Sequence, residues 1–197
     1  MAYTGLSKPF YAVYGVSGGT VSYSSGGSLG KFTELTLNLN DADSNILFAD
    51  NGPAESDDVF SGGTITATTD DLRQDIYKAI FGVTEETITA TGVTTQGAKW
   101  QVNDDDQVIP YLGFGGVAEK KIDGVMYYVA VVFNKVKFRN PNMSIKTRGE
   151  RIEWQTPQIV GDLFRSDGAK HPWCRLSTLL TTEAEAVAAV KDYLNIT

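Results

Sequence analysis

The chain has 197 residues, of which 42% are hydrophobic and 21% charged, so we expect one soluble globular domain over residues 1–197. Its net charge of −7 disfavours specific binding to nucleic-acid phosphates, although it suits a surface along which DNA passes without adhering. The single cysteine, Cys174, excludes an internal disulfide, and neither a bilayer-spanning apolar run nor a secretory signal pattern is present.

Strands dominate the first half of the chain. Residues 33–40 ("TELTLNLN") alternate strictly between leucines and polar side chains, which predicts a half-buried antiparallel strand. Residues 63–69 ("GTITATT") are β-branched at most positions and predict a second strand. The segment between them, residues 40–61, is acidic, has an apolar centre and is long for a hairpin connection. We interpret it as a functional loop.

Two helices are predicted, one near the middle of the chain and one at its C-terminal end. Residues 68–82 start with Thr68 or Thr69 as the cap and end at Gly82 in the C′ position. Residues 181–195 start with a capping box formed by Thr182 and Glu185. The expected packing face of this second helix consists of Val187, Val190 and Leu194.

A hairpin is predicted around Asp123 and Gly124, because this dipeptide favours a type I′ turn. Its second arm, residues 125–133, is apolar on both faces. Each face must therefore be covered by a helix, a second sheet or another subunit.

A further strand is predicted over residues 147–164 ("TRGERIEWQTPQIVGDLF"). Ile152 and Trp154 would lie on one side of this strand, with charged and amide side chains on the other. Pro157 marks a bend or an unpaired edge position, since proline cannot donate to a sheet ladder.

Motifs that could perform chemistry are weak. Residues 15–19 ("GVSGG") match a nucleophile elbow only formally, because no helix follows. Residues 41–52 begin like a calcium loop but have Ile46 and Gly52 where glycine and glutamate are needed. His171 and Cys174 are interpreted as packing residues, as are Trp100, Trp154 and Trp173 in the core or an interface. We therefore expect no enzyme, no cofactor and no metal.

The chain resembles the major tail proteins of long-tailed bacteriophages of Gram-positive bacteria, which are tail tube proteins. The resemblance rests on "GLSKPFYAVY" near the N-terminus, on "TLNLND" followed by "GTITATTDDLRQDIYKAIFG", and on "FRNPNMSIKTRGERIEWQTPQIVGDLF". It covers nearly the whole chain and is most specific within residues 147–164.

The resemblance implies a mainly β fold: an antiparallel β-sandwich or barrel flanked by one α-helix, plus a C-terminal helix. It also implies a non-enzymatic subunit that assembles with itself into stacked hexameric rings of the virion tail, after synthesis in the host cytoplasm. The implied partners are a tape-measure protein, a tail terminator and distal tail or baseplate proteins. DNA would pass through the bore during ejection without specific binding.

Three sets of residues are candidates for this role. The candidate lumen-facing residues, from the polar sides of two predicted strands, are Glu34, Thr36, Asn38, Arg151, Glu153 and Gln155. The candidate ring-stacking residues, from the acidic loop at about 40–61, are Asp41, Asp43, Ile46, Leu47, Phe48, Asp50, Asp57 and Asp58. The candidate subunit-interface residues, from the two-sided apolar strand, are Tyr127, Val129, Val131 and Phe133.

Other classes stay open. A different phage structural protein, such as a tail terminator, a head-decoration protein or the tube of a contractile tail or tail-like bacteriocin, would share most of these features. A β-sandwich carbohydrate-binding module would need aromatic residues clustered on one face. An enzyme is disfavoured because the chain has only one histidine and one cysteine.

Overall fold

The computed structural model describes residues 3–40, 45–49, 52–57, 60–142, 147 and 156–197. The strands are β1 (Tyr3–Ser17), β2 (Thr20–Ser28), β3 (Phe32–Leu39), β4 (Asn45–Ala49), β5 (Gly52–Asp57), β6 (Gly63–Thr69), β7 (Thr84–Thr87), β8 (Lys99–Val102), β9 (Leu112–Ile122), β10 (Val125–Phe138), β11 (Gln158–Phe164) and β12 (Cys174–Leu176). The helices are α1 (Gln74–Phe81) and α2 (Glu183–Tyr193). The chain is mainly β, as predicted.

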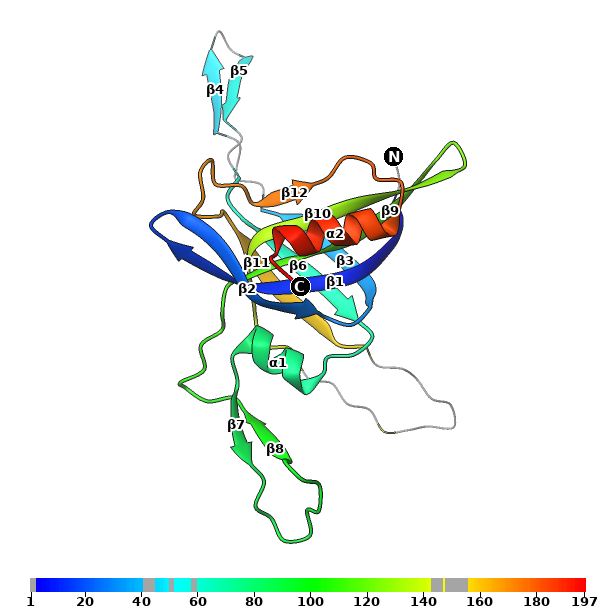
Figure 1. Ribbon diagram of the computed structural model, residues 1–197. Coiled ribbons are helices and arrows are strands. Elements are labelled where there is room, and N and C mark those ends of the chain that lie inside the picture. The colour runs from blue at the N-terminus through cyan, green and yellow to red at the C-terminus, as the bar shows by residue number, and fades with distance from the viewer. Residues whose placement is uncertain (1–2, 41–44, 50–51, 58–59, 143–146, 148–155) are drawn as a thin grey trace.

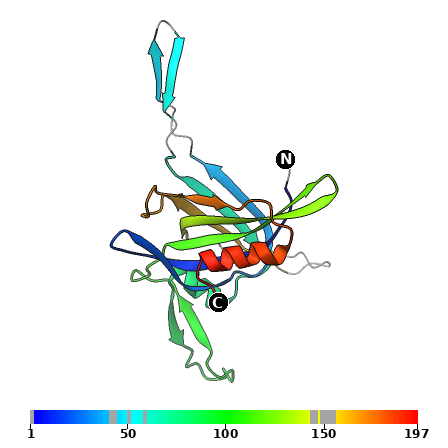
Figure 2. The same cartoon turned by 45° about the horizontal axis from the view of Figure 1, so that its top comes forward.

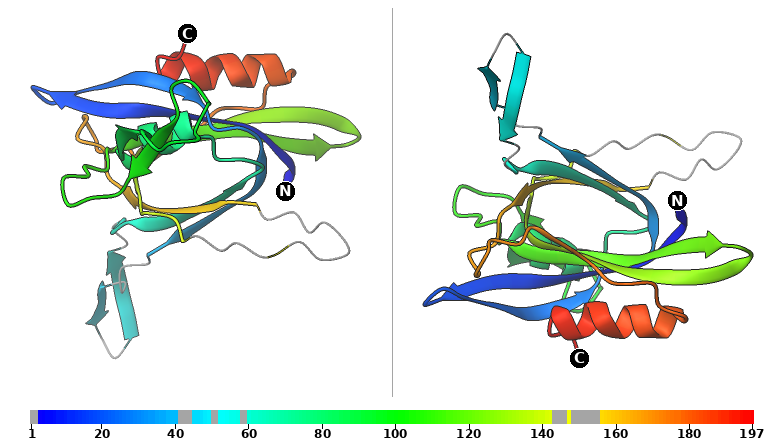
Figure 3. Two further views of the ribbon diagram at one scale, coloured as in Figure 1. Left: turned by 90° about the horizontal axis from the view of Figure 1, so that it is seen from below. Right: turned by 90° about the horizontal axis from the view of Figure 1, so that it is seen from above.

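One antiparallel sheet organises the fold. Its strands follow the order β2-β1-β9-β10-β11-β6-β3, and the short β12 pairs with β10. The sheet curls so that β2, β1, β9 and β10 form one layer of a β-sandwich while β11, β6 and β3 form the other (Figure 3). β2 and β3 are therefore the two edge strands of this path.

Tight turns join the long strands of the first layer. Gly18 and Gly19, between β1 and β2, have φ values of 56° and 78°. Asp123 and Gly124, between β9 and β10, have φ values of 48° and 84°, which fits the predicted type I′ turn. The "GVSGG" motif is thus a hairpin turn that leads into a strand.

The main core lies between the two layers. Phe114 and Phe138 meet edge to face there, with ring centroids 5.3 Å apart, and both are buried. α1 contributes its buried Ile80 and Phe81 to the same core and lies at one end of the sandwich (Figure 1). Burial of such apolar surface is the main favourable term in folding.

A second core lies on the outside of the first layer, under α2 (Figure 3). Val190 of α2 and its C-cap residue Leu194 are fully buried there, in one cluster with Ala130 and Val132 of β10. The predicted packing face of the C-terminal helix is confirmed at these two helix positions, while Val187 is half-buried against the same cluster.

This arrangement explains why β10 is apolar on both faces. α2 covers the face with Ala130 and Val132, and the second layer covers the face with Phe133. Val129 and Phe133 are only 4% and 3% exposed within the single chain. The sandwich and its helix thus provide cover that could otherwise have come from a neighbouring subunit.

The first predicted helix is shorter than expected. α1 begins at Gln74, and its N-cap is Arg73, whose side chain makes no capping hydrogen bond. Thr68 and Thr69, predicted as caps, belong to β6 instead, because the β-branched run continues its ladder with β3. Gly82 ends the helix in the left-handed conformation with φ 64°, as predicted.

Two hairpins differ from the sequence-based expectation. The acidic segment predicted as a loop contains β4 and β5, which pair antiparallel from Asn45–Asp57 to Ala49–Gly52. β7 and β8 form another hairpin, which the sequence pattern did not predict because both strands are short and charged. The two hairpins project from opposite ends of the sandwich (Figures 1 and 2).

The strand predicted over residues 147–164 is confirmed only for its last part. β11 begins at Gln158, directly after Pro157, and pairs with both β6 and β10. A proline just before the first ladder residue removes no sheet hydrogen bond. Ile152 and Trp154 lie outside the described residues.

The predicted capping box of α2 is confirmed and gives a stability test. The Thr182 hydroxyl accepts from the backbone N–H of Glu185 at 3.3 Å, and the Glu185 carboxylate accepts from the Thr182 N–H at 3.1 Å. We expect Thr182→Ala to lower the free energy of unfolding by about 1 kcal/mol, measured by urea titration. Thr178→Ala, at an exposed position outside the helix, is the matched control and should change it by less than about 0.5 kcal/mol. Equal values for the two variants would contradict the prediction.

Candidate functional site

The second layer of the sandwich presents a polar outer surface. The side chains that point away from the core come from β3, β6 and β11, and neither helix packs on them (Figure 3). We call this surface the polar sheet face; it consists of Glu34, Thr36, Asn38, Thr64, Thr66, Thr68, Gln158, Val160 and Asp162.

Strand register brings these side chains into rows. Thr66 lies between Thr36 of β3 and Val160 of β11, because it is the direct partner of both. Its neighbours along β6 are flanked in the same way, with Thr68 between Glu34 and Gln158 and Thr64 between Asn38 and Asp162. Directly opposed residues of an antiparallel pair share one face of the sheet.

The same strands point apolar residues inward. Ile65, Ala67 and Ile159 are fully buried in the core between the layers, whereas Thr64 and Thr66 are half-exposed. Burial of one face fixes which residues point outward, since successive side chains of a strand alternate.

The polar sheet face bears little unbalanced charge. Asp162 binds the guanidinium of Arg139 through two contacts, Nε–Oδ2 at 3.0 Å and Nη2–Oδ1 at 2.5 Å. This hydrogen-bonded pairing raises the pKa of Arg139. Glu34 is the other carboxylate, and the remaining side chains are hydroxyls, amides and one valine. None of the nine residues of this face is a cation, and the two cations beside it, Arg139 and the direct β10 partner Lys137, both lie at Asp162. Away from Asp162 the face therefore offers phosphate groups no cation to hold them.

The edge beside this face is regular. β3 is the last strand of the sheet path and pairs without interruption with β6 from Glu34 to Leu39, where Leu39 is 43% exposed. The opposite edge, β2, is broken by a register shift near Ser24, and Ser25 has φ 49°. Bulges protect edge strands from pairing with other chains, so β3 is the edge better suited to continue the sheet.

The β4–β5 hairpin extends from the same two strands that build most of the polar sheet face. The β3–β6 ladder continues to Asn40, whose N–H donates to the carbonyl of Gly62 at 3.0 Å, and the chain between them forms the hairpin. The hairpin strands include Ile46, Leu47, Phe48 and Asp57. The other candidate ring-stacking residues lie outside the described part of the chain: Asp41, Asp43, Asp50 and Asp58.

An apolar pocket of about 340 Å³ opens at the end of the sandwich where the N-terminus and β12 lie, away from α1 (Figure 1). Its walls come from β1, β3, β9, β10 and β12, and the lining includes Leu35, Leu37 and Trp173. Tyr3 and Leu176 at its rim are 54% and 60% exposed. We call it the apolar end pocket.

The candidate subunit-interface residues divide between the pocket and the core. Val131 and Phe133 line the apolar end pocket, Val129 is buried, and Tyr127 is half-buried. Val129 and Phe133 are covered within the subunit itself, so their apolar character alone does not require a neighbour. Val131 stays accessible through the pocket.

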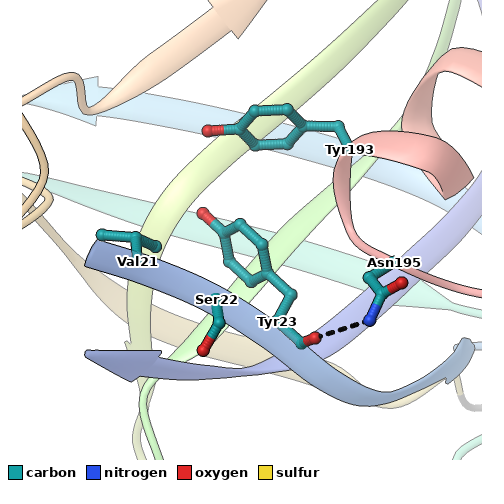
Figure 4. A pocket seen from close by; sticks show the side chains of 5 residues that line it. All are labelled: Val21, Ser22, Tyr23, Tyr193 and Asn195. Carbon is teal, nitrogen blue, oxygen red and sulfur yellow. Dashed lines mark hydrogen bonds between the residues drawn. The ribbon is translucent and has the colours of Figure 1, made fainter. Parts of the chain in front are cut away.

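A second hollow, of about 310 Å³, lies between β2 and the C-terminal end of α2, lined by Tyr23, Tyr193 and Asn195 among others (Figure 4). The Asn195 amide donates to the carbonyl of Tyr23 at 3.1 Å, and the Tyr23 hydroxyl donates to the carbonyl of Asn134 at 3.0 Å. Burial is the main cause that raises the pKa of Tyr23. These groups fasten the end of α2 to the sheet, and we assign them a structural role.

The residues tested for chemistry do not form a reactive centre. His171 Nδ1 lies 2.9 Å from the backbone carbonyl of Ser166, while Cys174 lines the apolar end pocket. Among the described residues there is no group of three or more metal-ligating side chains. Within the same residues, neither helix has the length and apolar character that crossing a membrane requires.

The structure brings together only part of the predicted lumen-facing set. Glu34, Thr36 and Asn38 share the polar sheet face, whereas Arg151, Glu153 and Gln155 lie outside the described residues. The threonines of β6 are not among the predicted site residues, although the alternation of "GTITATT" indicates them. The tryptophans, all predicted to be packing residues, differ in their surroundings. Trp173 stacks on Phe60 with centroids 4.6 Å apart, but Trp100 is 60% exposed on β8.

Comparison of the sequence with known protein families and with curated proteins gave no match.

The environment of Cys174 gives a prediction about its reactivity. Burial raises the pKa of this thiol from 9.0 to about 11, so about one molecule in a thousand carries the thiolate at pH 8. Because the thiolate is the nucleophile, we expect the rate of alkylation by iodoacetamide to rise about tenfold per pH unit between pH 7 and pH 10. The urea-unfolded chain is the control and should level off near pH 9. A plateau below pH 9 in the folded protein would contradict the assignment.

Proposed function

We propose that this protein is the structural subunit of a phage tail tube, which assembles into stacked hexameric rings around a hollow bore. The observation that carries the proposal is the polar sheet face, uncovered by either helix and bordered by β3, whose regular outer edge pairs with no strand in the part of the chain that the structure describes. The resemblance of the sequence to phage major tail proteins is the basis for proposing stacked rings and six subunits in each ring. The proposed role is non-enzymatic.

The edge of β3 provides a way to form a ring. An unpaired regular edge is a template for pairing, and a contact between different surfaces of identical subunits closes into a ring when the rotation allows it. With β3 set beside β11 of its neighbour, where only residues 161–164 are paired with β10, the β11–β6–β3 layers of successive subunits would follow one another around the ring. They would then line a large barrel.

The polar sheet face suits the inner wall of such a barrel. Thr36, Thr64, Thr66 and Thr68 offer hydroxyl groups, which can hydrogen-bond to water, and the paired Asp162 adds no free charge. A duplex binds tightly where lysine and arginine neutralise its phosphates. A wall of hydroxyls and amides in a chain of net charge −7 instead lets DNA slide past.

The β4–β5 hairpin is the proposed contact to the next ring. It projects beyond the sandwich from the strands that would line the bore (Figures 1 and 2). Its first strand contains Ile46, Leu47 and Phe48, a residue sequence suited to docking on an apolar surface. The proposed partners beyond the tube itself are a tape-measure protein, a tail terminator and distal tail or baseplate proteins. The proposed location is the virion tail.

The proposal is tested by electron microscopy of the purified protein in negative stain. We expect rings and tubes with an open bore to form as the protein concentration is raised toward that in an infected cell. Single rings that never stack would favour a terminator or decoration protein. A persistent monomer that is retained on a glycan column would favour the carbohydrate-binding module and overturn the tube proposal.

Chemical labelling tests which surface lines the bore. In a Cys174→Ala background, Thr66→Cys should react with a small maleimide both in subunits and in tubes. A polymer-linked maleimide too large for the bore should label the same position in subunits but at least about tenfold less in tubes. The control is Ala188→Cys on the exposed side of α2, which should react equally with both reagents in tubes. Equal protection at both positions would reject the lumen assignment.

Deletion of Asp41 to Asp58 tests the hairpin. The deletion should leave the β3–β6 ladder intact, since Asn40 and Gly62 already bond across the junction. We expect a folded subunit with an unchanged far-UV spectrum that forms no long tubes. Tubes of normal length in micrographs would contradict the stacking role.

A further inference from the structure

The two ends of the sandwich differ in a complementary way. One end presents the apolar end pocket, and the β7–β8 hairpin projects from the other end with an exposed tryptophan (Figure 1). When an exposed apolar group on one surface fits a pocket on another surface of the same molecule, copies join head to tail, and the contact repeats as an open stack where the two surfaces lie at opposite ends of the molecule.

The hairpin holds Trp100 outward. Its inner side chains are tied to α1: Glu85 binds Lys78 at 2.9 Å, and the Gln101 amide donates to the carbonyl of Gln74 at 2.5 Å. Trp100 precedes Gln101 on β8 and therefore points to the opposite face. The indole is 60% exposed, so it is placed away from the subunit that bears it.

The hairpin is also held rigidly enough to present this indole. Lys99 of β8 binds the same Glu85 at 2.8 Å, and the Thr84 hydroxyl donates to Asp104 at 2.7 Å beyond the end of β8. The hydrogen bonds from Lys99 and Lys78 lower the pKa of Glu85, so this carboxylate stays charged at neutral pH. A tryptophan on an anchored strand loses little conformational entropy when it docks.

The apolar end pocket accepts an aromatic side chain. Its volume of about 340 Å³ is large enough for one indole, and its walls are leucine, valine, phenylalanine and tryptophan side chains. α1 fills the opposite end of the sandwich with its own apolar residues, whereas the described part of the chain supplies no such plug here. An apolar group from outside would remove the exposed Leu176 and Tyr3 from water.

Charges beside the two surfaces are opposite in sign. Glu86 is the direct cross-strand partner of Trp100 and lies on the same face of the hairpin. Lys120 lies over the ring of Tyr3 at the pocket rim, with its Nζ 4.5 Å from the ring centroid. No ion pair joins either side chain to another residue that the structure describes. An indole in the pocket would bring this carboxylate and ammonium to the same rim.

We propose that Trp100 of one copy docks into the apolar end pocket of a second copy, with Glu86 set against Lys120. This contact rests on the proposed tube function and adds a second ring-to-ring connection to that of the β4–β5 hairpin. The two connections point in opposite directions, because the β7–β8 hairpin with Trp100 and the β4–β5 hairpin project from opposite ends of the subunit (Figure 1).

The test compares self-association of the full chain and of single variants by sedimentation and negative-stain microscopy. Trp100→Ala should weaken end-to-end association about 30-fold or more, since buried tryptophans at interface centres have effects of this size. The control is Val93→Ala, an exposed apolar position in the loop of the same hairpin, which should associate like the wild type. Both variants change exposed side chains, and equal unfolding midpoints verify that they fold.

Complementation gives a second readout. Leu176→Asp places a carboxylate at the pocket rim, where it opposes both the indole and Glu86. Each variant alone should fail to extend, yet a mixture of Trp100→Ala and Leu176→Asp should form one contact, from the intact indole to the intact pocket, and stop there. A mixture that shows no association between unlike variants would overturn the docking.

The outcomes separate this contact from the tube proposal. Tubes of wild-type length from Trp100→Ala overturn the docking and leave the tube standing. Association that requires Trp100 but never produces rings supports the docking and overturns the tube. A wild-type chain that stays monomeric overturns both. An aliphatic molecule retained in the pocket in native mass spectra, together with association that ignores Trp100, shows a different occupant and also overturns the docking.

Discussion

The position of β6 between β3 and β11 is the constraint on which the second layer depends. Its ladders set Ile65 and Ala67 against the core and turn Thr64, Thr66 and Thr68 outward. A slip of one residue would exchange these two sets, burying hydroxyls and exposing an isoleucine. Unsatisfied buried hydroxyls cost free energy, so the core that stabilises the fold also fixes the surface that we propose for the bore. The same ladders of β6 with β3 and β11 therefore hold the core together and set the outward residues of the proposed bore surface.

The first layer differs from the second because both of its faces are covered by other parts of the chain. β10 is apolar on both faces, and the chain supplies α2 for one of them at the cost of ordering a C-terminal segment. α2 thereby covers the outer side of the first layer, while neither helix covers the outer side of the second layer. In the tube that we propose, the first of these sides would be the outer wall and the second the inner wall.

The sequence predicts the local structure well where one pattern dominates. The alternation in β3 and β6, the Asp123-Gly124 turn, the Gly82 stop and the Thr182 capping box are all confirmed, because each depends on neighbours in the sequence. The sequence does not predict the β4–β5 and β7–β8 hairpins, because β5 opens with Gly52 and Pro53 and β7 is "TEET", and neither strand shows an apolar alternation. Edge ribbons tolerate proline and charge without a buried face, which leaves little pattern to detect.

The candidate surfaces were harder to predict than the elements. The polar residues of β3 could be assigned from alternation, but their union with β6 and β11 into one face requires the order of strands in the sheet. The apolar end pocket joins Tyr3 to Leu176, which are far apart in the chain, so no window of the sequence contains it. The aromatic residue that could insert into a pocket of another copy can be chosen only once the exposure of each tryptophan is known. Trp173 is held against Phe60, whereas Trp100 is left in water.

The two hairpins at opposite ends of the sandwich give the subunit a direction. Any assembly that repeats by translation along this direction inherits it, so its two termini are chemically unlike. With the docking that we propose, one terminus would expose unused pockets and the other unused indoles. Proteins that start or finish such an assembly can therefore distinguish the first subunits from the last without measuring length, and growth at each terminus follows its own rate.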